Sequence, residues 1–292
     1  MPYENSSINK ITDHNLIAII PAAGSGDRLG LGLPKALAEV NGETILTRTL
    51  TRFLTTSIFS RIIVTAPFKH FNVFERSLQR SVELAGKILA PSVRDPRHRY
   101  CVIPDLIVGG STRADSVKNA LDAIDRREPE ETIVLLHDAA RIFVSEQLIR
   151  RCIEVAVRSG AASVAVPIVD TVRRASAIEG LSQLGQVVDR GCLWGMQTPQ
   201  AFKLSLLRLA LDRCEKNRLP TTIVSDDPAL RGEIPPSDDH LYMTDEVGMV
   251  QRLVPVEYIL GSPLNFKITT QADLEMASLL QIISESPPGG KN

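Results

Sequence analysis

Residues 16–30 read LIAIIPAAGSGDRLG, an apolar run followed by a turn rich in glycine and alanine. A short, continuous apolar run is typical of a parallel strand that is buried on both faces. Small residues in the turn let a ligand approach the backbone closely, and free N–H groups there can point at anionic oxygens. The stretch therefore predicts the first strand of an α/β domain, with a functional loop at its carboxyl end.

The sequence after this strand alternates between helical spacing and short apolar runs. Apolar residues recur at helical spacing from Ile45 to Leu54, and RIIVTA at 61–66 then predicts a strand that Pro67 stops. Further strands are expected at 106–108, 132–136 and 162–166, and further helices at 116–124 and 146–157. This alternation predicts the α/β class, as a single-domain, open, mostly parallel (Rossmann-like) sheet with helices on both faces. Ligands of such sheets bind beyond the carboxyl ends of the strands.

The ends of the chain and two internal stretches depart from the alternation. Residues 1–14 and 284–292 are polar or rich in Pro and Gly, so we expect a mobile N-terminal extension and a flexible C-terminal tail. The stretches 85–100 and 221–239 read as irregular insertions. The domain itself is accordingly expected to span residues 15–283.

The bulk composition disfavours several classes of function. The 292 residues have a formal net charge of -1, which gives no electrostatic reason to expect nucleic acid as a partner. No apolar stretch is long enough to span a bilayer, and the polar start lacks the apolar core of a secretory signal, so a cytoplasmic protein without a membrane partner is expected. The 4 cysteines form no CxxC pair, and we expect small buried hydrophobic side chains rather than a zinc site or disulfides.

The glycine-rich turn is followed by Leu33-Pro-Lys-Ala36, and together the two segments suit a triphosphate. Arg28 and Lys35 add positive charge to a backbone that is open to phosphate oxygens. An NAD site is disfavoured, because the glycines read GxGxxxG and the next strand ends without an acidic residue for the ribose. A P-loop is disfavoured because the lysine follows Pro34 instead of glycine. A glycine-rich turn with two solvated cations is the simpler alternative.

A second motif follows the predicted strand at 106–108. It reads GGSTRADSV over residues 109–117, with a glycine pair before a helix whose first turn offers Ser116. Backbone amides and a hydroxyl in this arrangement suit recognition of the edge of a base. Taken alone, the motif is more simply explained as an ordinary capped helix start.

A third motif, His137-Asp-Ala-Ala-Arg141, follows the predicted strand at 132–136. A carboxylate at that position, Asp138, is well placed to bind Mg²⁺, which prefers oxygen ligands and bridges phosphate oxygens. Arg141 could pair with a substrate phosphate. The alternative is an aspartate that caps the next helix beside a solvated arginine. For His137 we expect a structural hydrogen-bonding role.

These three motifs, with six others in the same order, resemble those of the 2-C-methyl-D-erythritol 4-phosphate cytidylyltransferases of the non-mevalonate isoprenoid pathway. The resemblance runs from about Leu16 to Leu280. The six are Asp170-Thr-Val-Arg173, Val188-Asp-Arg190, Leu193-Trp194, Gln197-Thr-Pro-Gln200, Thr244-Asp-Glu246 and Asn265-Phe-Lys267. The resemblance implies a nucleotidyltransferase-type fold and attack of a substrate phosphate oxygen on the α-phosphorus of CTP, with release of pyrophosphate.

The resemblance also implies roles for individual residues. Arg28, Lys35 and Lys267 would be catalytic, holding the triphosphate and stabilising charge at the α-phosphate. Residues of two loops would bind CTP, and Asp138 would hold Mg²⁺ or another divalent cation. The CTP-binding set is Ala22, Ala23, Gly24, Ser25, Gly26, Gly110, Ser111, Arg113 and Ser116. The set that binds the second substrate is Asp138, Arg141, Thr171, Arg190 and Lys267.

The segment at about 168–191 resembles a protruding β-arm that, in this family, reaches across a homodimer. The resemblance therefore implies that Thr171 and Arg190 would serve the neighbouring subunit's site. The residues themselves indicate only that 172–186 is a poor helix and a plausible hairpin.

Three features depart from the family: Ile142 replaces the usual Pro, Ala36 replaces a frequent Gln, and the two insertions are longer than expected.

Two other functions remain open at this point. Ribitol 5-phosphate cytidylyltransferase shares the fold, the CTP loop and the metal site and differs in the substrate pocket. A non-catalytic nucleotide-binding protein would keep the fold without the chemistry. The full set of charges at Arg28, Lys35, Asp138 and Lys267 favours an enzyme over the second alternative.

Overall fold

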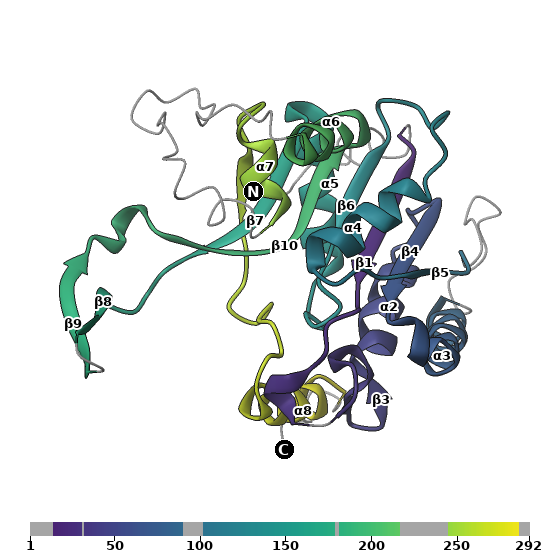
Figure 1. Ribbon diagram of the computed structural model, residues 1–292. Coiled ribbons are helices and arrows are strands. Elements are labelled where there is room, and N and C mark those ends of the chain that lie inside the picture. Colours follow the sequence, from purple (N-terminus) through teal and green to yellow (C-terminus); the bar gives the residue numbers. More distant parts are fainter. Residues whose placement is uncertain (1–13, 31, 90–101, 179–180, 217–244, 286–292) are drawn as a thin grey trace, which may run out of the picture.

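The computed structural model describes residues 14–30, 32–89, 102–178, 181–216 and 245–285, and within them seven strands form one sheet (Figure 1). The order across the sheet is β11-β7-β10-β6-β1-β4-β5. The strands are β1 (Leu16–Pro21), β4 (Arg61–Ala66), β5 (Asp105–Val108), β6 (Ile133–Leu136), β7 (Ala161–Pro167), β10 (Trp194–Lys203) and β11 (Glu257–Leu260). The two short strands β2 (Glu39–Val40) and β3 (Glu43–Thr44) form a separate hairpin.

The sheet is mostly parallel. β1 lies between β4 and β6 and is parallel to both, and β5 and β11 add parallel strands at the two edges. Among the described strands of this sheet, only β10 is antiparallel, to β6 on one side and to β7 on the other. The four apolar residues of β6 and the first five residues of β1 are all buried, as expected for strands covered on both faces. The predicted open α/β sheet is confirmed.

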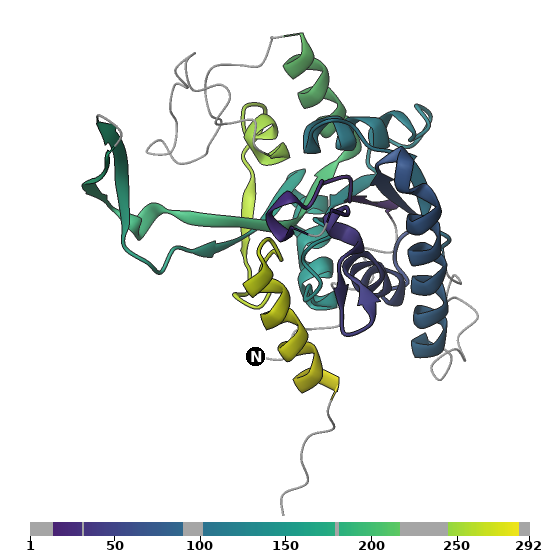
Figure 2. The same cartoon turned by 60° about the horizontal axis from the view of Figure 1, so that its bottom comes forward.

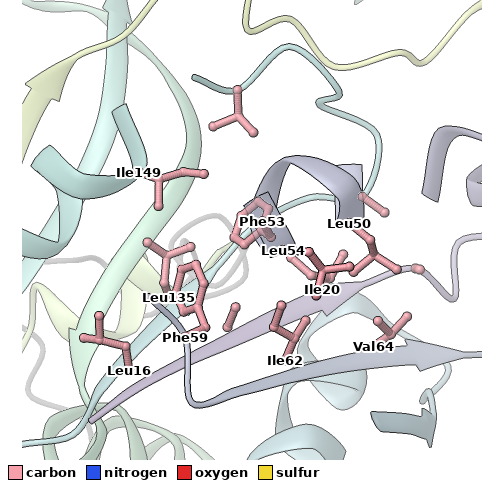
Figure 3. Close-up of a cluster of buried hydrophobic side chains, with 14 of the residues drawn as sticks. Leu16, Ile20, Leu50, Phe53, Leu54, Phe59, Ile62, Val64, Leu135 and Ile149 are labelled. Carbon is pink, nitrogen blue, oxygen red and sulfur yellow. The ribbon is translucent and has the colours of Figure 1, made fainter. Parts of the chain in front are cut away.

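Helices cover both faces of the sheet and bury two apolar clusters against it. One cluster joins β1, β4 and β6 to α2 (Ile45–Thr55), α3 (Phe71–Leu89) and α5 (Glu146–Ser159). Figure 3 shows Phe53 and Phe59 in this cluster, beside Ile20 and Leu135 of the sheet. The other cluster packs α4 (Arg113–Asp122), α6 (Leu204–Glu215) and α7 (Glu246–Val250) on the opposite face.

A third, smaller cluster fastens the C-terminal part of the chain to the loop that follows β6. It joins Ile268, in the segment that leads into α8 (Gln271–Glu285), and Ala277 of α8 to Ala140 and Ile142. Ile142, which departs from the pattern of the resemblance, is buried in this cluster. Four short 3₁₀ turns lie between the longer described elements: Asp27–Leu29, Lys35–Leu37, Phe68–His70 and Arg190–Cys192.

Some predicted boundaries were wrong. α4 begins at Arg113 rather than at Ser116, because Thr112 and Asp115 form a reciprocal capping box that starts the helix earlier. α3 continues to Leu89, so residues 85–89 of the first predicted insertion are helical. α8 includes residues 284 and 285, which were assigned to the tail. The predicted N-terminal extension (1–13), the rest of the first insertion and the whole second insertion lie outside the described residues.

A two-stranded antiparallel hairpin, β8 (Val172–Ile178) and β9 (Leu181–Val188), projects from the sheet (Figures 1 and 2). It forms where the sequence predicted one. The strands that enter and leave it are β7 and β10, which pair with each other at the base. We call the hairpin and its base, residues 168–191, the arm.

The cysteine prediction was partly wrong. Cys152 is buried, as expected, whereas Cys192 is exposed because it lies in the 3₁₀ turn at the base of the arm. Cys101 lies outside the described residues. In the part of the chain that the structure describes, no helix is both long and apolar enough to cross a membrane.

Candidate active site

A cavity of about 350 Å³ opens beyond the carboxyl ends of β1, β5 and β6, where the topology of the sheet predicts a ligand site. Three loops and one residue from near the C-terminus line it. The lining residues are Pro21, Ala22, Ala23, Gly24, Ser25, Lys35, Ala36, Gly110, Ser111, Thr112, Arg113, Ser116, Asp138, Ala139, Ala140 and Lys267. All three motifs singled out in the sequence therefore meet at one place.

The glycine-rich loop owes its shape to Gly26. This residue has a φ of 78°, in the left-handed region that favours glycine. A Cβ at this position would lie 2.7 Å from the carbonyl oxygen of Leu33 and 2.8 Å from the nitrogen of Lys35. The Lys35 N–H donates to the carbonyl oxygen of Gly24 at 3.2 Å, which folds the chain back and brings Lys35 to the wall of the cavity. For Arg28 the structure describes the backbone only, because its side chain lies outside the described set.

We expect Gly26→Ala to weaken CTP binding at least about tenfold and to lower the melting temperature by only a few degrees. Left-handed backbone costs an alanine about 1–2 kcal/mol, and the added methyl group would also collide with backbone atoms of the Lys35 segment. The loop must open, so Lys35 would be displaced from the wall. Isothermal titration with CTP measures the effect. Gly86→Ala is the control, because no atom lies within 4 Å of its added Cβ, and unaltered CTP affinity in Gly26→Ala would contradict the role of the loop.

The second loop is held by the start of α4. The Ser116 hydroxyl donates to the carbonyl oxygen of Thr112 at 2.9 Å and accepts from the Gly110 N–H at 3.1 Å. Ser111 Oγ donates to the Asp115 carboxylate at 2.6 Å. Ser116 is buried, and the start of the helix is capped by Thr112 and Asp115. The motif is thus a cap that also forms one wall of the cavity, so the two interpretations of the sequence are compatible.

Asp138 is the centre of charge in the cavity. Its carboxylate lies 3.0 Å from Lys267 Nζ, 3.2 Å from Arg113 Nε and 3.5 Å from Arg141 Nε. Burial raises the pKa of the Asp138 carboxyl, but the three cations outweigh burial and hold its pKa well below the usual range. Asp138 therefore stays ionised at neutral pH, with a side chain that is 11% exposed.

The structure places Arg141 behind the cavity rather than in its wall. Its guanidinium is buried and donates to the carbonyl oxygens of Asn265 at 2.8 Å and Met196 at 3.4 Å. The Ile268 N–H donates to the carbonyl oxygen of Ala140 at 2.9 Å. These bonds tie the C-terminal segment to the loop after β6, and they bring Lys267 to Asp138.

His137 has the structural role expected of it. The Asp138 N–H donates to Thr198 Oγ1 at 3.0 Å, and the Thr198 hydroxyl is 3.0 Å from His137 Nδ1. His137 Nε2 lies 3.1 Å from the carbonyl oxygen of Arg141, which assigns the proton to Nε2. The ring is fully buried beside Phe53, and burial lowers the pKa of His137 to about 4.

This depressed pKa predicts a loss of stability in mild acid. Between about pH 6.5 and pH 4 the unfolded chain binds a proton at His137 that the folded protein does not bind, so the free energy of unfolding falls as the pH falls. The full contribution is about 3 kcal/mol. Urea unfolding of the wild type and His137→Gln in metal-free buffer measures it. We expect the variant to be less stable at pH 7 and its free energy of unfolding to change less with pH than that of the wild type. The same pH dependence in both proteins would contradict the assignment.

Sequence reasoning missed three residues that support the site. Glu246 of α7 is buried and pairs with Arg113, and Thr198 supports Asp138 from β10. Asn265 Nδ2 donates to Gln197 Oε1 at 3.1 Å and to the carbonyl oxygen of Thr198 at 2.8 Å. All three lie in motifs that the sequence analysis quoted, but neither spacing nor residue type indicates their partners.

The arm residues do not reach this cavity within one chain. Thr171 and Arg190 are exposed at the base of the arm, and Arg190 Nη1 donates to the carbonyl oxygen of Val169. Neither residue lines the cavity. The arm projects away from the body of the molecule (Figure 2).

The residues present fit a divalent cation that arrives with a nucleotide. Among the described residues, no three His, Cys, Asp or Glu side chains gather to hold a metal ion by themselves. Asp138 supplies one ionised carboxylate at the wall of the cavity. Mg²⁺ is commonly held by one or two carboxylates together with substrate phosphates, so a single carboxylate in a phosphate-binding cavity suits it.

Comparison with known proteins agrees with this geometry. The family model of IspD, 2-C-methyl-D-erythritol 4-phosphate cytidylyltransferase, matches residues 16–234. Proteins of that name from Deinococcus radiodurans and Syntrophus aciditrophicus are 36% and 31% identical, and each alignment covers 90% of this chain and 88% or 94% of the relative.

Solved structures of the same enzyme have the same fold. The crystal structure from Thermus thermophilus has a TM-score of 0.60 at 30% identity and covers 91% of this chain and 98% of that one. The structure from Francisella tularensis has a TM-score of 0.63 at 29% identity, with 91% and 99% covered. The chain therefore belongs to the 2-C-methyl-D-erythritol 4-phosphate cytidylyltransferase family.

Proposed function

We propose that the chain is a nucleotidyltransferase that joins CTP and 2-C-methyl-D-erythritol 4-phosphate to give 4-diphosphocytidyl-2-C-methyl-D-erythritol and pyrophosphate, in isoprenoid precursor biosynthesis. The observation that supports it best is the convergence of a glycine-rich loop, Lys35, Asp138 and Lys267 on one cavity. Membership of the family supplies the substrates. The cavity has backbone N–H groups that phosphate oxygens can approach, and beside that backbone lie the charged side chains of Lys35, Asp138 and Lys267.

In this reaction a phosphate oxygen of the second substrate attacks the α-phosphorus of CTP in line, and pyrophosphate leaves. The protein has little covalent chemistry to perform, so its contribution is positioning and charge stabilisation. Lys35 and Lys267, with Arg28 on the same loop as Gly26, are proposed to hold the triphosphate and to stabilise negative charge that develops at the α-phosphate. Ala22–Gly26 and Gly110, Ser111, Arg113 and Ser116 are proposed to surround the nucleotide.

Mg²⁺ bound at Asp138 would neutralise charge on the phosphates and orient them. Asp138 is suited to this because it stays ionised, and because the Thr198 hydroxyl and the fold of the loop after β6 fix its backbone. Arg141 is proposed to act indirectly, because its guanidinium holds in place the segment that bears Lys267.

We infer a homodimer in which the arm of one subunit completes the site of the other. Within one chain Thr171 and Arg190 lie on the arm and away from the cavity, yet the resemblance assigns both to the second substrate. An arm that reaches a neighbouring subunit reconciles the two facts. The single domain at 15–283 and the cytoplasmic location expected from the sequence complete the proposal.

Hybrid dimers test the shared site. Lys267→Ala and Arg190→Ala should each be nearly inactive alone, because every site lacks one group. After subunit exchange in equal amounts, half of the dimers contain one intact site, so about a quarter of the wild-type activity should return. An exchange of two Lys267→Ala samples is the control. A mixture that stays inactive, with mixed dimers verified by mass, would contradict a shared site.

The reaction itself is tested by pyrophosphate release with Mg²⁺, CTP and 2-C-methyl-D-erythritol 4-phosphate, beside ATP, UTP and ribitol 5-phosphate as alternatives. We expect turnover only with CTP and methylerythritol phosphate. A clear preference for ribitol phosphate in kcat/KM would keep the mechanism and change the substrate. No turnover with any pair, from folded protein, would contradict the proposal and favour a nucleotide-binding protein.

A further inference from the structure

Glu246 is a buried carboxylate that lies behind the cavity. It is in the first turn of α7, its side chain is only 1% exposed, and it does not line the cavity. Its Oε2 atom accepts a hydrogen bond from Arg113 Nη1. A carboxylate this deeply buried is costly unless it is paired, so the contact with Arg113 must be maintained in the folded protein.

Arg113 is therefore shared by two carboxylates. Its Nη1 faces Glu246, and its Nε donates to Asp138 Oδ1 at 3.2 Å. Burial lowers the pKa of Arg113, but the two carboxylates outweigh burial and raise it, so the guanidinium is a permanent cation. Unlike Glu246, Arg113 lines the cavity. The guanidinium thus connects the buried acid to the acid that faces the ligands.

The framework of the sheet fixes Glu246 in place. The adjacent residue, Asp245, accepts from the Gly248 N–H at 3.0 Å and from Gln200 Nε2 at 2.9 Å. Gln200 belongs to β10, and Met249 and Val250 of α7 are packed in the apolar cluster on that face. Arg113 is therefore held from a rigid part of the molecule and not from a surface loop.

A cation that binds Asp138 must compete with Arg113 and Lys267 for the carboxylate oxygens. If Arg113 had Asp138 as its only acidic partner, it would hold that carboxylate more tightly and place an unbalanced positive charge beside the metal. Glu246 supplies the second partner. We propose that Glu246 is a positioning residue that retains and neutralises Arg113, so that Asp138 is available to the divalent cation that accompanies CTP. This inference rests on the proposed function.

The test is the strength of the coupling between Mg²⁺ and CTP. Calorimetric titration of the full chain with CTP, at saturating MgCl₂ and in EDTA, gives the factor by which Mg²⁺ tightens binding. In Glu246→Gln we expect this factor to fall about tenfold or more, the usual effect of removing a partner of a metal-site residue. CTP affinity in EDTA should be unchanged or higher, because Arg113 then offers more positive charge to the phosphates.

Two further variants separate positioning from simple damage. Asp105→Asn likewise removes the acidic partner of an arginine, Arg61 at 2.5 Å, but at the start of β5 and away from the cavity, so it should lower the melting temperature and leave the coupling unchanged. Glu246→Asp keeps the charge and should restore part of the coupling. The inference is overturned if Glu246→Gln keeps the wild-type coupling, or if it weakens CTP binding equally with and without Mg²⁺. Wild-type protein that binds no CTP would instead contradict the proposed function.

Discussion

Lys267→Ala is expected to lower kcat by about 10²- to 10³-fold, because a positioned charge at a transition state is typically worth about 3–4 kcal/mol. Lys267 Nζ lies 3.0 Å from Asp138 and lines the cavity, so it is placed to stabilise charge as the phosphorus is attacked. KM for CTP should change much less than kcat, since the interaction strengthens in the transition state. Steady-state kinetics with pyrophosphate detection gives both constants.

Lys203→Ala is the matched control for this variant. Lys203 also pairs with a carboxylate, that of Glu131 at 2.6 Å. It lies beside Ile133 at the start of β6, however, whereas Asp138 follows the other end of β6. Near-native kcat is expected there. Near-native kcat in Lys267→Ala, with an unchanged melting temperature, would remove Lys267 from the catalytic set.

Asp138→Asn should lower kcat at least as much as Lys267→Ala does, and it should also change how the activity depends on Mg²⁺. The substitution keeps the shape of the side chain but leaves three cations, Lys267, Arg113 and Arg141, around a neutral group. We expect kcat to fall by at least about 10³-fold and the dependence of the residual activity on Mg²⁺ to disappear, because the carboxylate that Asp138 contributes to the cavity wall is lost.

The measurement is kcat over a range of MgCl₂ concentrations, with the melting temperature of each sample. Asp122→Asn is the control, since Asp122 pairs with Lys118 on the surface of α4. Removing one partner of a surface pair changes stability little. Undiminished, Mg²⁺-dependent turnover in Asp138→Asn would exclude Asp138 from the metal site.

Five of the seven strands and the cavity were predictable because they depend on local patterns. Each of these five strands contains a short apolar run, and each functional loop follows directly after such a run, so Gly26, Ser116 and Asp138 could be assigned to one end of the sheet. β10 and β11 were not predicted, since β10 buries the polar side chains of Gln197, Thr198 and Gln200 and has no such run. The start of α4 was misplaced because its capping box lies in polar residues that also read as a loop. Periodicity locates the apolar face of a helix better than its ends.

The supporting residues could not be predicted, because their roles depend on contacts between distant segments. Glu246 is 133 residues from Arg113 along the chain, and Asn265 is 67 residues from Thr198. Arg141 is a different case. Its residue type and position predict a phosphate ligand, and this role stays a prediction, because its buried guanidinium donates to backbone carbonyls.

The bond between the Ile268 N–H and the Ala140 carbonyl attaches Lys267 to a sheet that is formed without it. Every described strand of the sheet precedes residue 261, so the strands themselves do not include the segment that bears Lys267. The cavity gains that cation only when the segment before α8 docks on the loop after β6. A chain truncated between β11 and Lys267 would keep every described strand of the sheet and lack one of the proposed catalytic cations, so we expect it to fold and to have no turnover. The architecture and the proposed catalytic charge depend on different parts of the chain.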